Sequence, residues 1–477
     1  MMKTFLLLVF LSSSFLHGIA QQGVSKIDKT DLKTFVSVLA SDSLEGRGTG
    51  TRGQEKAAKY ISDRFTELGL HPFSHDSYYE EFELKRTRWG EVFVRTQDKT
   101  FHNFGNMVFQ GSYPQNEEVE KEVVFGGRGS REELDQIDVQ DRLVLVLVDN
   151  LRGNYDLNSL LARKKAAGLI LANPGNARQF EVIKNTFRDY SLRESISLAR
   201  TNSAHSVAEW DTLRFINTIM ISNADVKSLS GLSIRELTKL VTEKRIKDAP
   251  VTKIRLRFER IGDVIHTANV VGVIKGKGSK SIVISAHYDH LGKSGKEFFP
   301  GADDNASGIA ALLELAEAFS GETDLPHSIV FLATSAEEAG LLGSIYHVNT
   351  PQFDPKNILC NLNLDMISRR DDRHRNSSYL YCIGTGQSAQ LDSVIQKADS
   401  MFGDCHFDYS LNSADPAGIF ARTDSYTFSR KGIPAIHFFS GLNSDYHQPT
   451  DTPDKINFED LANRVRLIGL VIGLLQK

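Results

Sequence analysis

The sequence predicts an α/β fold: a mostly parallel mixed sheet flanked by helices, with a smaller domain inserted into the main one. After residue 263, apolar runs of strand length alternate with segments of helical periodicity, which is typical of a parallel sheet covered by helices. Residues 87–262 do not show this regular alternation and contain no cluster of catalytic side chains. The chain has 477 residues, 40% hydrophobic and 24% charged, which allows about three domains.

The charge and cysteine content argue against several classes of protein. There are 56 Lys and Arg against 60 Asp and Glu and no basic block, so no nucleic-acid partner is expected. The 3 cysteines, with no C-x-x-C spacing, do not suit a disulfide scaffold or a thiolate zinc site. The composition also excludes collagen, disordered, coiled-coil and polytopic membrane proteins.

The first twenty residues are typical of a secretory signal peptide. Lys3 supplies a positive charge, residues 5–16 an apolar core, and residues 18–20 a small-x-small cleavage site. No cysteine follows the cut, so no lipid anchor is expected there. The other long apolar stretch, residues 467–475, has about half the length of a membrane span. We expect an exported protein, periplasmic or secreted, with no membrane span in the mature chain.

Two helices are expected at the start of the mature chain. Apolar residues recur at helical spacing in residues 32–39, and a second helix is expected near 54–68, before Gly69, a typical helix end. Between them, residues 48–53 match the G-x-G-x-x-G string of a dinucleotide site. That site requires a preceding strand, which residues 41–45 do not form, so no dinucleotide cofactor is expected.

The domain organisation follows from these patterns. We expect a signal peptide at 1–20, a main domain at 21–86 and 263–477, and an inserted domain at 87–262. Alternating residues at 79–86 and 91–96 lead into the inserted domain. Within it, the apolar runs 143–148 and 169–171 predict strands covered on both faces, with a helix around 160–167 between them.

The main domain alternates strands and helices. Buried strands are expected at 269–274, 281–286, 328–334, 358–364, 379–383 and 433–439. Helical periodicity covers 306–319, 388–401 and 458–475, with a shorter helix at 341–348. Ionisable residues follow the strand ends or precede the first of these helices: His287, Asp289, Asp303, Asp304, Glu337, Glu338, Asp365 and His447. Ligands bind outside the carboxyl ends of the strands of open α/β sheets, so these side chains are expected to lie close together.

This set of side chains predicts a metal site. Imidazole and carboxylate groups without thiolate suit a catalytic Zn²⁺, with Mn²⁺ or Co²⁺ as alternatives. There are more carboxylates than one ion uses, so two ions bridged by one carboxylate are expected. A hydrolase also needs a base beside the activated water, and the adjacent Glu337 and Glu338 supply one ligand and one base.

The motifs that contain these residues resemble those of the co-catalytic zinc peptidases related to bacterial leucyl aminopeptidase and glutamate carboxypeptidase II. They are HYDH at 287–290, GADDNASG at 301–308, SAEE at 335–338, NLDM at 363–366, YH at 446–447 and TDT at 450–452. The resemblance covers residues 269–477 and includes LEGRGTG at 44–50. The intervening module resembles the protease-associated domain often inserted in such peptidases.

The resemblance implies roles that spacing does not assign. Two Zn²⁺ ions would be held by His287, Asp304, Glu338, Asp365 and His447. Of these, His287 and Asp365 would hold one ion, Glu338 and His447 the other, and Asp304 would bridge the two. Glu337 would be the general base, and Asp289 would orient His287.

The resemblance also implies residues that face the substrate. Tyr446 lies where some relatives place a tyrosine that hydrogen-bonds the oxyanion. Arg422 and Asp424 resemble a substrate-proximal element. In the family a histidine often follows this aspartate, whereas here Ser425 follows.

Several neighbouring residues are expected to be structural. His437 is expected to be a core histidine, and His290 is not needed as a ligand. Asp303 is expected to support its turn or cap the helix. Pairing of Cys382 with Cys405 stays open. The absence of a Gly-x-Ser-x-Gly string argues against a serine hydrolase.

The sequence thus predicts an exported metallopeptidase that cleaves peptides, and the resemblance favours an aminopeptidase. A carboxypeptidase or dipeptidase on the same site is the first alternative. A glutaminyl cyclase would be expected to bind one metal. A catalytically inactive binding protein would be expected to lack ligands or the base, and here none is missing.

Overall fold

The computed structural model describes residues 24–73, 76–111, 113–191, 194–199, 215–350, 352–374, 378–413, 415 and 417–477. The predicted signal peptide lies outside these residues. The chain divides into two compact units, the first made of the chain up to Leu84 together with Ile265–Lys477, and the second of Lys85–Val264. The boundaries expected after residues 86 and 262 each lie two residues from these.

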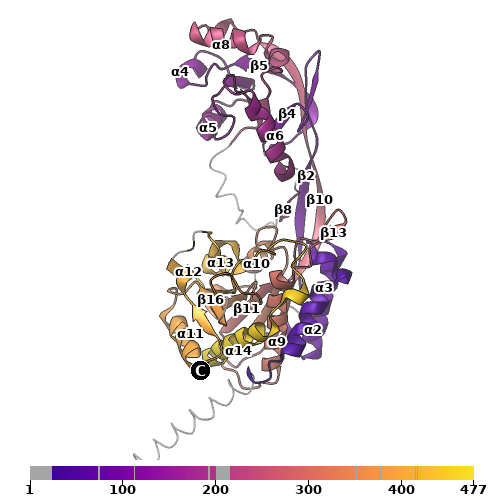
Figure 1. The fold of residues 1–477 in the computed structure, drawn as a ribbon, viewed down its shortest axis with the longest axis vertical. Helices are drawn as coiled ribbons and strands as arrows, with labels where there is room; N and C mark the ends of the chain where they lie inside the picture. The colour runs from indigo at the N-terminus through magenta and orange to yellow at the C-terminus, as the bar shows by residue number, and fades with distance from the viewer. Residues whose placement is uncertain are drawn as a thin grey trace, which may run out of the picture. The chain divides into compact units, whose positions relative to one another are not determined.

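The first unit is built on a mostly parallel mixed sheet flanked by helices (Figure 1). Its strands are, in spatial order, β17 (His406–Asp408), β16 (Tyr379–Ile383), β18 (Ala435–Phe439), β15 (Ile358–Leu364), β11 (Ser281–His287), β14 (Ser328–Thr334) and the last part of β10 (Thr252–Ile274). β11 pairs in parallel with β14 and β15, and β15 with β18. β10 and β16 are antiparallel to their neighbours β14 and β18. The carboxyl ends of four central strands therefore meet at one edge.

All six predicted strands of this domain are present; the first is the end of the longer strand β10, which begins at Thr252 and not at 269, and the last begins two residues late, at Ala435. Alternate residues of the central strands face opposite layers. Ile282 and Ile284 pack in one apolar core and Val283 in another, so both faces of the sheet are covered as the continuous apolar runs predict.

The described residues of this unit form eight α-helices, four of which are capped at their start by a polar side chain. They are α2 (Lys29–Leu39), α3 (Arg52–Glu67), α9 (Gly308–Ser320), α10 (Leu342–His347), α11 (Ala389–Met401), α12 (Ser410–Ser413), α13 (Asp424–Ser429) and α14 (Phe458–Leu475). The side chains of Asp28, Thr51, Ser388 and Asn457 accept hydrogen bonds from the first turns of α2, α3, α11 and α14. α14 is apolar on all sides in its second half and is buried there. Within the described ranges, no helix is long and apolar enough to span a membrane.

The second unit has apolar cores of its own and a group of parallel strands. Strands β5 (Gln115–Phe125), β6 (Leu143–Leu147), β7 (Gly168–Ala172) and β9 (Thr218–Ile221) are parallel, and β4 (Met107–Gln110) joins β9 antiparallel. Its helices are α4 (Arg131–Leu134), α5 (Tyr155–Arg163), α6 (Arg178–Ser191), α7 (Val226–Ser230) and α8 (Ile234–Thr242). β3 (Thr100–His102) and β8 (Ser195–Leu198) pair with β2 (Tyr79–Arg95).

Two details of this region differ from the prediction. The two alternating stretches form the single strand β2. The helix expected at 160–167 begins earlier, at Tyr155, and ends at Arg163, because Lys165 has a left-handed backbone with φ 61° that no helix continues through.

The three cysteines are buried and free. β16 pairs with β17 so that Tyr379 lies opposite His406. Cys405 therefore lies beside residue 378, and the four residues from there to Cys382 span about 13 Å of strand. The pairing left open by the sequence is absent from this structure.

Candidate metal centre

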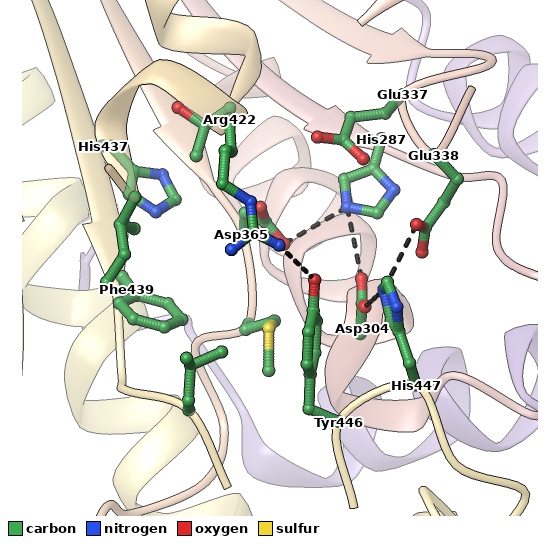
Figure 2. A pocket seen from close by; sticks show the side chains of 14 residues that line it. His287, Asp304, Glu337, Glu338, Asp365, Arg422, His437, Phe439, Tyr446 and His447 are labelled. Carbon is green, nitrogen blue, oxygen red and sulfur yellow. Dashed lines mark hydrogen bonds and ion pairs between the residues drawn. The ribbon is translucent and has the colours of Figure 1, made fainter. Parts of the chain in front are cut away.

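The predicted site residues converge on one pocket at the carboxyl edge of the sheet in the first unit (Figure 2). Eight of the ten line it: His287, Asp304, Glu337, Glu338, Asp365, Arg422, Tyr446 and His447. His287 ends β11 and Asp365 follows β15, while Glu337 and Glu338 follow β14. Asp304 lies in the turn before α9, and His447 in the loop after β18. The parallel strand order thus brings together residues far apart in the sequence.

One group of ligand atoms surrounds His287. Its Nε2 lies 3.2 Å from Oδ1 of Asp365 and 3.4 Å from Oδ1 of Asp304. One ligand atom of each of these residues lies within 4.8 Å of the others, close enough for one metal ion. The other ring nitrogen, Nδ1, lies 3.1 Å from the carbonyl oxygen of Asp289. A carbonyl only accepts, so Nδ1 carries the proton and leaves Nε2 free for a metal.

A second group faces the other oxygen of Asp304. Nε2 of His447 lies 3.2 Å from Oδ2 of Asp304 and 3.2 Å from Oε2 of Glu338. His290 is also present: its Nδ1 lies 2.9 Å from Oε1 of Glu338 and 3.7 Å from Oδ2 of Asp304. His290, Asp304 and Glu338 form a second group that could hold a metal ion. The sequence interpretation set His290 aside, although its place three residues after His287 brings it to the same loop.

The carboxylate of Asp289 holds the loop that carries Glu337 and Glu338. Its Oδ1 accepts from the backbone N–H of Glu337 at 3.1 Å, and its Oδ2 from that of Glu338 at 3.3 Å. Thr49 Oγ1 donates to the same Oδ2 at 3.0 Å. Ala336 has φ 56°, a left-handed backbone in this turn between the strand end and the two glutamates. Nδ1 of His287 thus contacts the backbone carbonyl of Asp289 and lies 4.0 Å from Oδ1 of the Asp289 carboxylate, which also fixes the glutamate loop.

Charges and burial shift the pKa values of these groups. Burial raises the pKa of Asp289 to about 6, against the pull of His287. Burial also raises the pKa of Glu337 well above its ordinary value, and the charges of Glu338 and Asp365 add to this. For His447, burial opposes the charged form, but bonds to Asp304 and Glu338 raise its pKa to about 10. The pocket thus concentrates negative charge, as a site for cations requires.

Tyr446 and Arg422 lie together on the wall of the pocket. Arg422 Nη2 donates to the hydroxyl oxygen of Tyr446 at 3.0 Å, as Figure 2 shows. The Tyr446 ring stacks on His447 with ring centroids 3.8 Å apart. Asp424 does not line the pocket. It is buried at the start of α13, where Thr334 Oγ1 donates to its Oδ2 at 2.5 Å.

Three residues near the ligands have supporting positions. Asp303 accepts from Ser368 through one oxygen and from Asn443 through the other, so its side chain joins its turn to the loops after β15 and β18. Asp451, which the sequence analysis names as part of the TDT motif without a role, accepts from the backbone N–H groups of Asp303 and Asp304. His437 is buried, as expected for a core histidine, but it also lines the pocket, and burial lowers its pKa to about 4.

The donor set fits divalent metal ions. It consists of imidazole nitrogens and carboxylate oxygens, which suit Zn²⁺, Mn²⁺ or Co²⁺. None of the 14 residues lining the pocket is a cysteine, so no thiolate competes. The two oxygens of Asp304 face separate groups, the arrangement that a bridging ligand needs.

Comparison with known proteins agrees with this geometry. The model of peptidase family M28 matches residues 269–472. Aminopeptidase YwaD of Bacillus subtilis is 31% identical over 216 residues, 43% of this chain and 44% of that protein. An aminopeptidase from Aneurinibacillus sp. strain AM-1 shares the fold, with 20% identity and a TM-score of 0.54 over 95% of both chains. BSAP, a zinc aminopeptidase from Bacillus subtilis, has 19% identity and a TM-score of 0.50 over 94% of both chains.

The chain spans about half the length of the curated relatives it matches. The matched segment contains His287, Asp304, Glu338, Asp365 and His447, and so every predicted metal ligand. Residues 269–472 of the chain thus match the model of peptidase family M28, a family of peptidases.

Proposed function

We propose that this protein is a di-zinc aminopeptidase that removes N-terminal residues from peptides. The observation that carries the proposal is the position of Asp304, whose two oxygens each face a separate group of nitrogen and carboxylate donors. The shared fold with a zinc aminopeptidase supports zinc as the metal.

The proposed ligands are His287 and Asp365 for one ion, Glu338 and His447 for the other, and Asp304 for both. Zinc bound there would polarise the scissile carbonyl and lower the pKa of water at the site. The remaining chemistry belongs to the side chains of the protein.

Glu337 is the proposed general base. It lines the pocket beside the ligand Glu338, and its backbone is fixed by Asp289. Its carboxylate would take a proton from the attacking water and deliver it to the leaving amine. Burial raises its pKa above the ordinary value of a glutamate, which makes its carboxylate a stronger base.

Tyr446 is the proposed donor to the oxyanion. Arg422 has no acceptor atom, so the phenol oxygen must accept in their hydrogen bond. The proton of Tyr446 is then free to be donated to the oxygen on which negative charge develops. A donor of this kind contributes about 3–4 kcal/mol to the transition state.

The rest of the pocket suits an uncharged side chain of the substrate. Met366, Ile419, Phe439 and Leu442 give an apolar wall, and His437 is neutral there. The carboxylates at the metal end would attract the ammonium group of a free N-terminus. This arrangement supports amino- over carboxypeptidase activity.

Two further parts of the proposal concern the rest of the chain. The composition of residues 1–20 supports a signal peptide and hence export. The second unit, with its parallel strands β5, β6, β7 and β9, is proposed to be the protease-associated domain.

The test is hydrolysis of free and N-acetylated peptides by the wild type and Glu337→Gln, with metal content measured on both. We expect cleavage from the free N-terminus only, lost in Glu337→Gln while two metal ions per chain remain. Full activity of the variant would refute the assignment of Glu337.

A carboxypeptidase or dipeptidase is the second candidate, because the Arg422 guanidinium lines the same pocket and could bind a carboxylate. Cleavage that ignores acetylation would favour it. A metal content of one would favour a glutaminyl cyclase. A protein that binds no metal and cleaves no peptide would be a binding protein.

A further inference from the structure

Arg47 lies in the LEGRGTG segment, at the end of a short 3-10 helix (Asp42–Arg47) before α3, and its guanidinium is buried with 1% exposure. It donates four hydrogen bonds, all to backbone carbonyls. Nε donates to Tyr288 at 2.9 Å, and Nη2 to Gly301 at 2.9 Å. Nη1 donates to Leu39 at 2.5 Å and to Pro300 at 2.7 Å. In the part of the chain that the structure describes, no carboxylate forms an ion pair with it.

Three of these acceptors belong to segments that carry predicted metal ligands. Tyr288 stands between His287 and Asp289. Pro300 and Gly301 open the turn that contains Asp304. A single side chain thus connects the end of β11 with the turn before α9.

The backbone around Arg47 strengthens the same connection. The backbone N–H of His290 donates to the carbonyl of Arg47 at 3.2 Å, and that of Gly292 to Gly46 at 3.0 Å. Thr49 reaches the Asp289 carboxylate two residues further on. Residues 46–49 therefore contact the site at several points, although they precede it by more than 200 residues in the sequence.

The charge of Arg47 is matched to its surroundings. Burial lowers its pKa to about 10, so the group stays protonated, and the carboxylates of Asp304, Asp451 and Asp289 oppose the loss of its proton. A buried cation without such compensation would cost several kcal/mol. Arg47 does not line the pocket, so it has no direct contact with a substrate.

We propose that Arg47 is a positioning residue of the metal centre, which sets the distance between the segment carrying His287 and the turn carrying Asp304. This inference rests on the proposed metal centre. It predicts that loss of the guanidinium weakens metal binding, because both ions use Asp304 as a ligand. Groups that orient metal ligands typically contribute 10- to 100-fold to metal affinity.

The experiment measures zinc content and zinc affinity, by competition with a chelator, together with the melting temperature of each variant. Arg47→Gly suits the local backbone, whose φ is 52°, and leaves space for free guanidinium. Arg47→Lys keeps the charge but not the planar set of donors. We expect zinc affinity to fall about 10- to 100-fold in Arg47→Gly and less in Arg47→Lys. Guanidinium chloride, well below unfolding concentrations, should restore affinity in Arg47→Gly.

Arg464→Lys is the matched control. Arg464 is fully buried and also donates to backbone carbonyls, those of Tyr379, Ile367 and Arg369. These three residues all follow a single proposed ligand, Asp365, with Ile367 two residues after it, so Arg464 does not connect two ligand segments as Arg47 does. The control should lower the melting temperature without changing zinc affinity.

The outcomes separate the inference from the proposed function. If the wild type binds no zinc, the proposed metal centre fails. If the wild type binds two ions and both Arg47 variants bind them equally tightly, only the role of Arg47 is refuted. If Arg47→Gly fails to fold, Arg47→Lys provides the test. The inference is refuted if this variant binds zinc as tightly as the wild type while its melting temperature falls as in Arg464→Lys.

Discussion

Replacement of Asp289 by asparagine tests how the site is built. The carboxylate accepts from the backbone N–H groups of Glu337 and Glu338 and from Thr49. An asparagine side chain has one acceptor oxygen, so at least one backbone N–H then faces an NH₂ group. The variant loses one buried hydrogen bond to the loop, and the hydrogen bond that remains is no longer made to a charged group. Together these changes cost about 2–5 kcal/mol of free energy.

We expect Asp289→Asn to displace Glu337 and Glu338 and to leave His287 in place. The backbone carbonyl that accepts from His287 Nδ1 is unchanged in Asp289→Asn. The glutamate loop loses its fixed position, and a shift of about 1 Å at a catalytic base typically costs about 10²-fold in rate. We therefore expect kcat to fall by about 10²-fold, with the ion at His287 retained.

The assay is kcat and KM on a peptide cleaved by the wild type, with zinc content measured on the same samples. Thr49→Val is the control, since it removes one of the three donors and leaves the carboxylate intact; its effect should be only a few-fold. Wild-type kcat in Asp289→Asn would refute this reasoning. Loss of zinc from the His287 site would instead assign the carboxylate to the orientation of that histidine.

The remaining predictions concern an oxyanion donor and a pH-dependent stability. Tyr446→Phe should lower kcat by about 10²-fold with little change in KM, and Arg422→Met should add nothing to it in the double variant, because the arginine acts through the hydroxyl; additive losses would contradict this. Burial raises the pKa of Glu314, in α9, from 4.5 to about 7. The folded state thus binds this proton more tightly, and the associated stability, present below pH 4.5, is lost as pH rises through 7. Glu314→Gln keeps an acceptor for the N–H of Asp28. Its free energy of unfolding in urea, relative to that of the wild type, should therefore rise by about 2–3 kcal/mol between pH 4.5 and about pH 8. A difference that is equal at all pH values would show that the titration of Glu314 is not the cause.

Much of the fold follows from the sequence because the central strands are buried on both faces. A parallel strand such as β14, with the apolar residues 329–333, shows the nearly continuous apolar run that burial on both faces requires. The convergence of His287, Asp365 and Glu338 follows in turn, because parallel strands end at the same edge. In the first unit the starts of the predicted helices lie within three residues of the observed ones, where cap residues such as Ser388 mark some of them, whereas α5 of the second unit begins five residues earlier than predicted.

The contacts that hold the ligands were less accessible to sequence reasoning. Arg47 donates its hydrogen bonds to backbone carbonyl groups. Every residue has such a carbonyl, so the sequence contains no pattern that identifies the partners of Arg47. Asp424 was placed near the substrate by its motif, yet it is buried against Thr334, a contact between distant segments. His290 was set aside because the ligand set was complete without it, and only the geometry brings it against Glu338.

The central claim is a pair of metal ions that share Asp304, and zinc titration of the metal-free protein tests it most directly. The account predicts two zinc ions per chain in the wild type, with peptidase activity restored as they bind. Asp304→Ala should weaken both ions together, because each oxygen of this carboxylate faces one ligand group. A wild-type protein that is fully active with one ion, or an Asp304→Ala variant that keeps both, would contradict it.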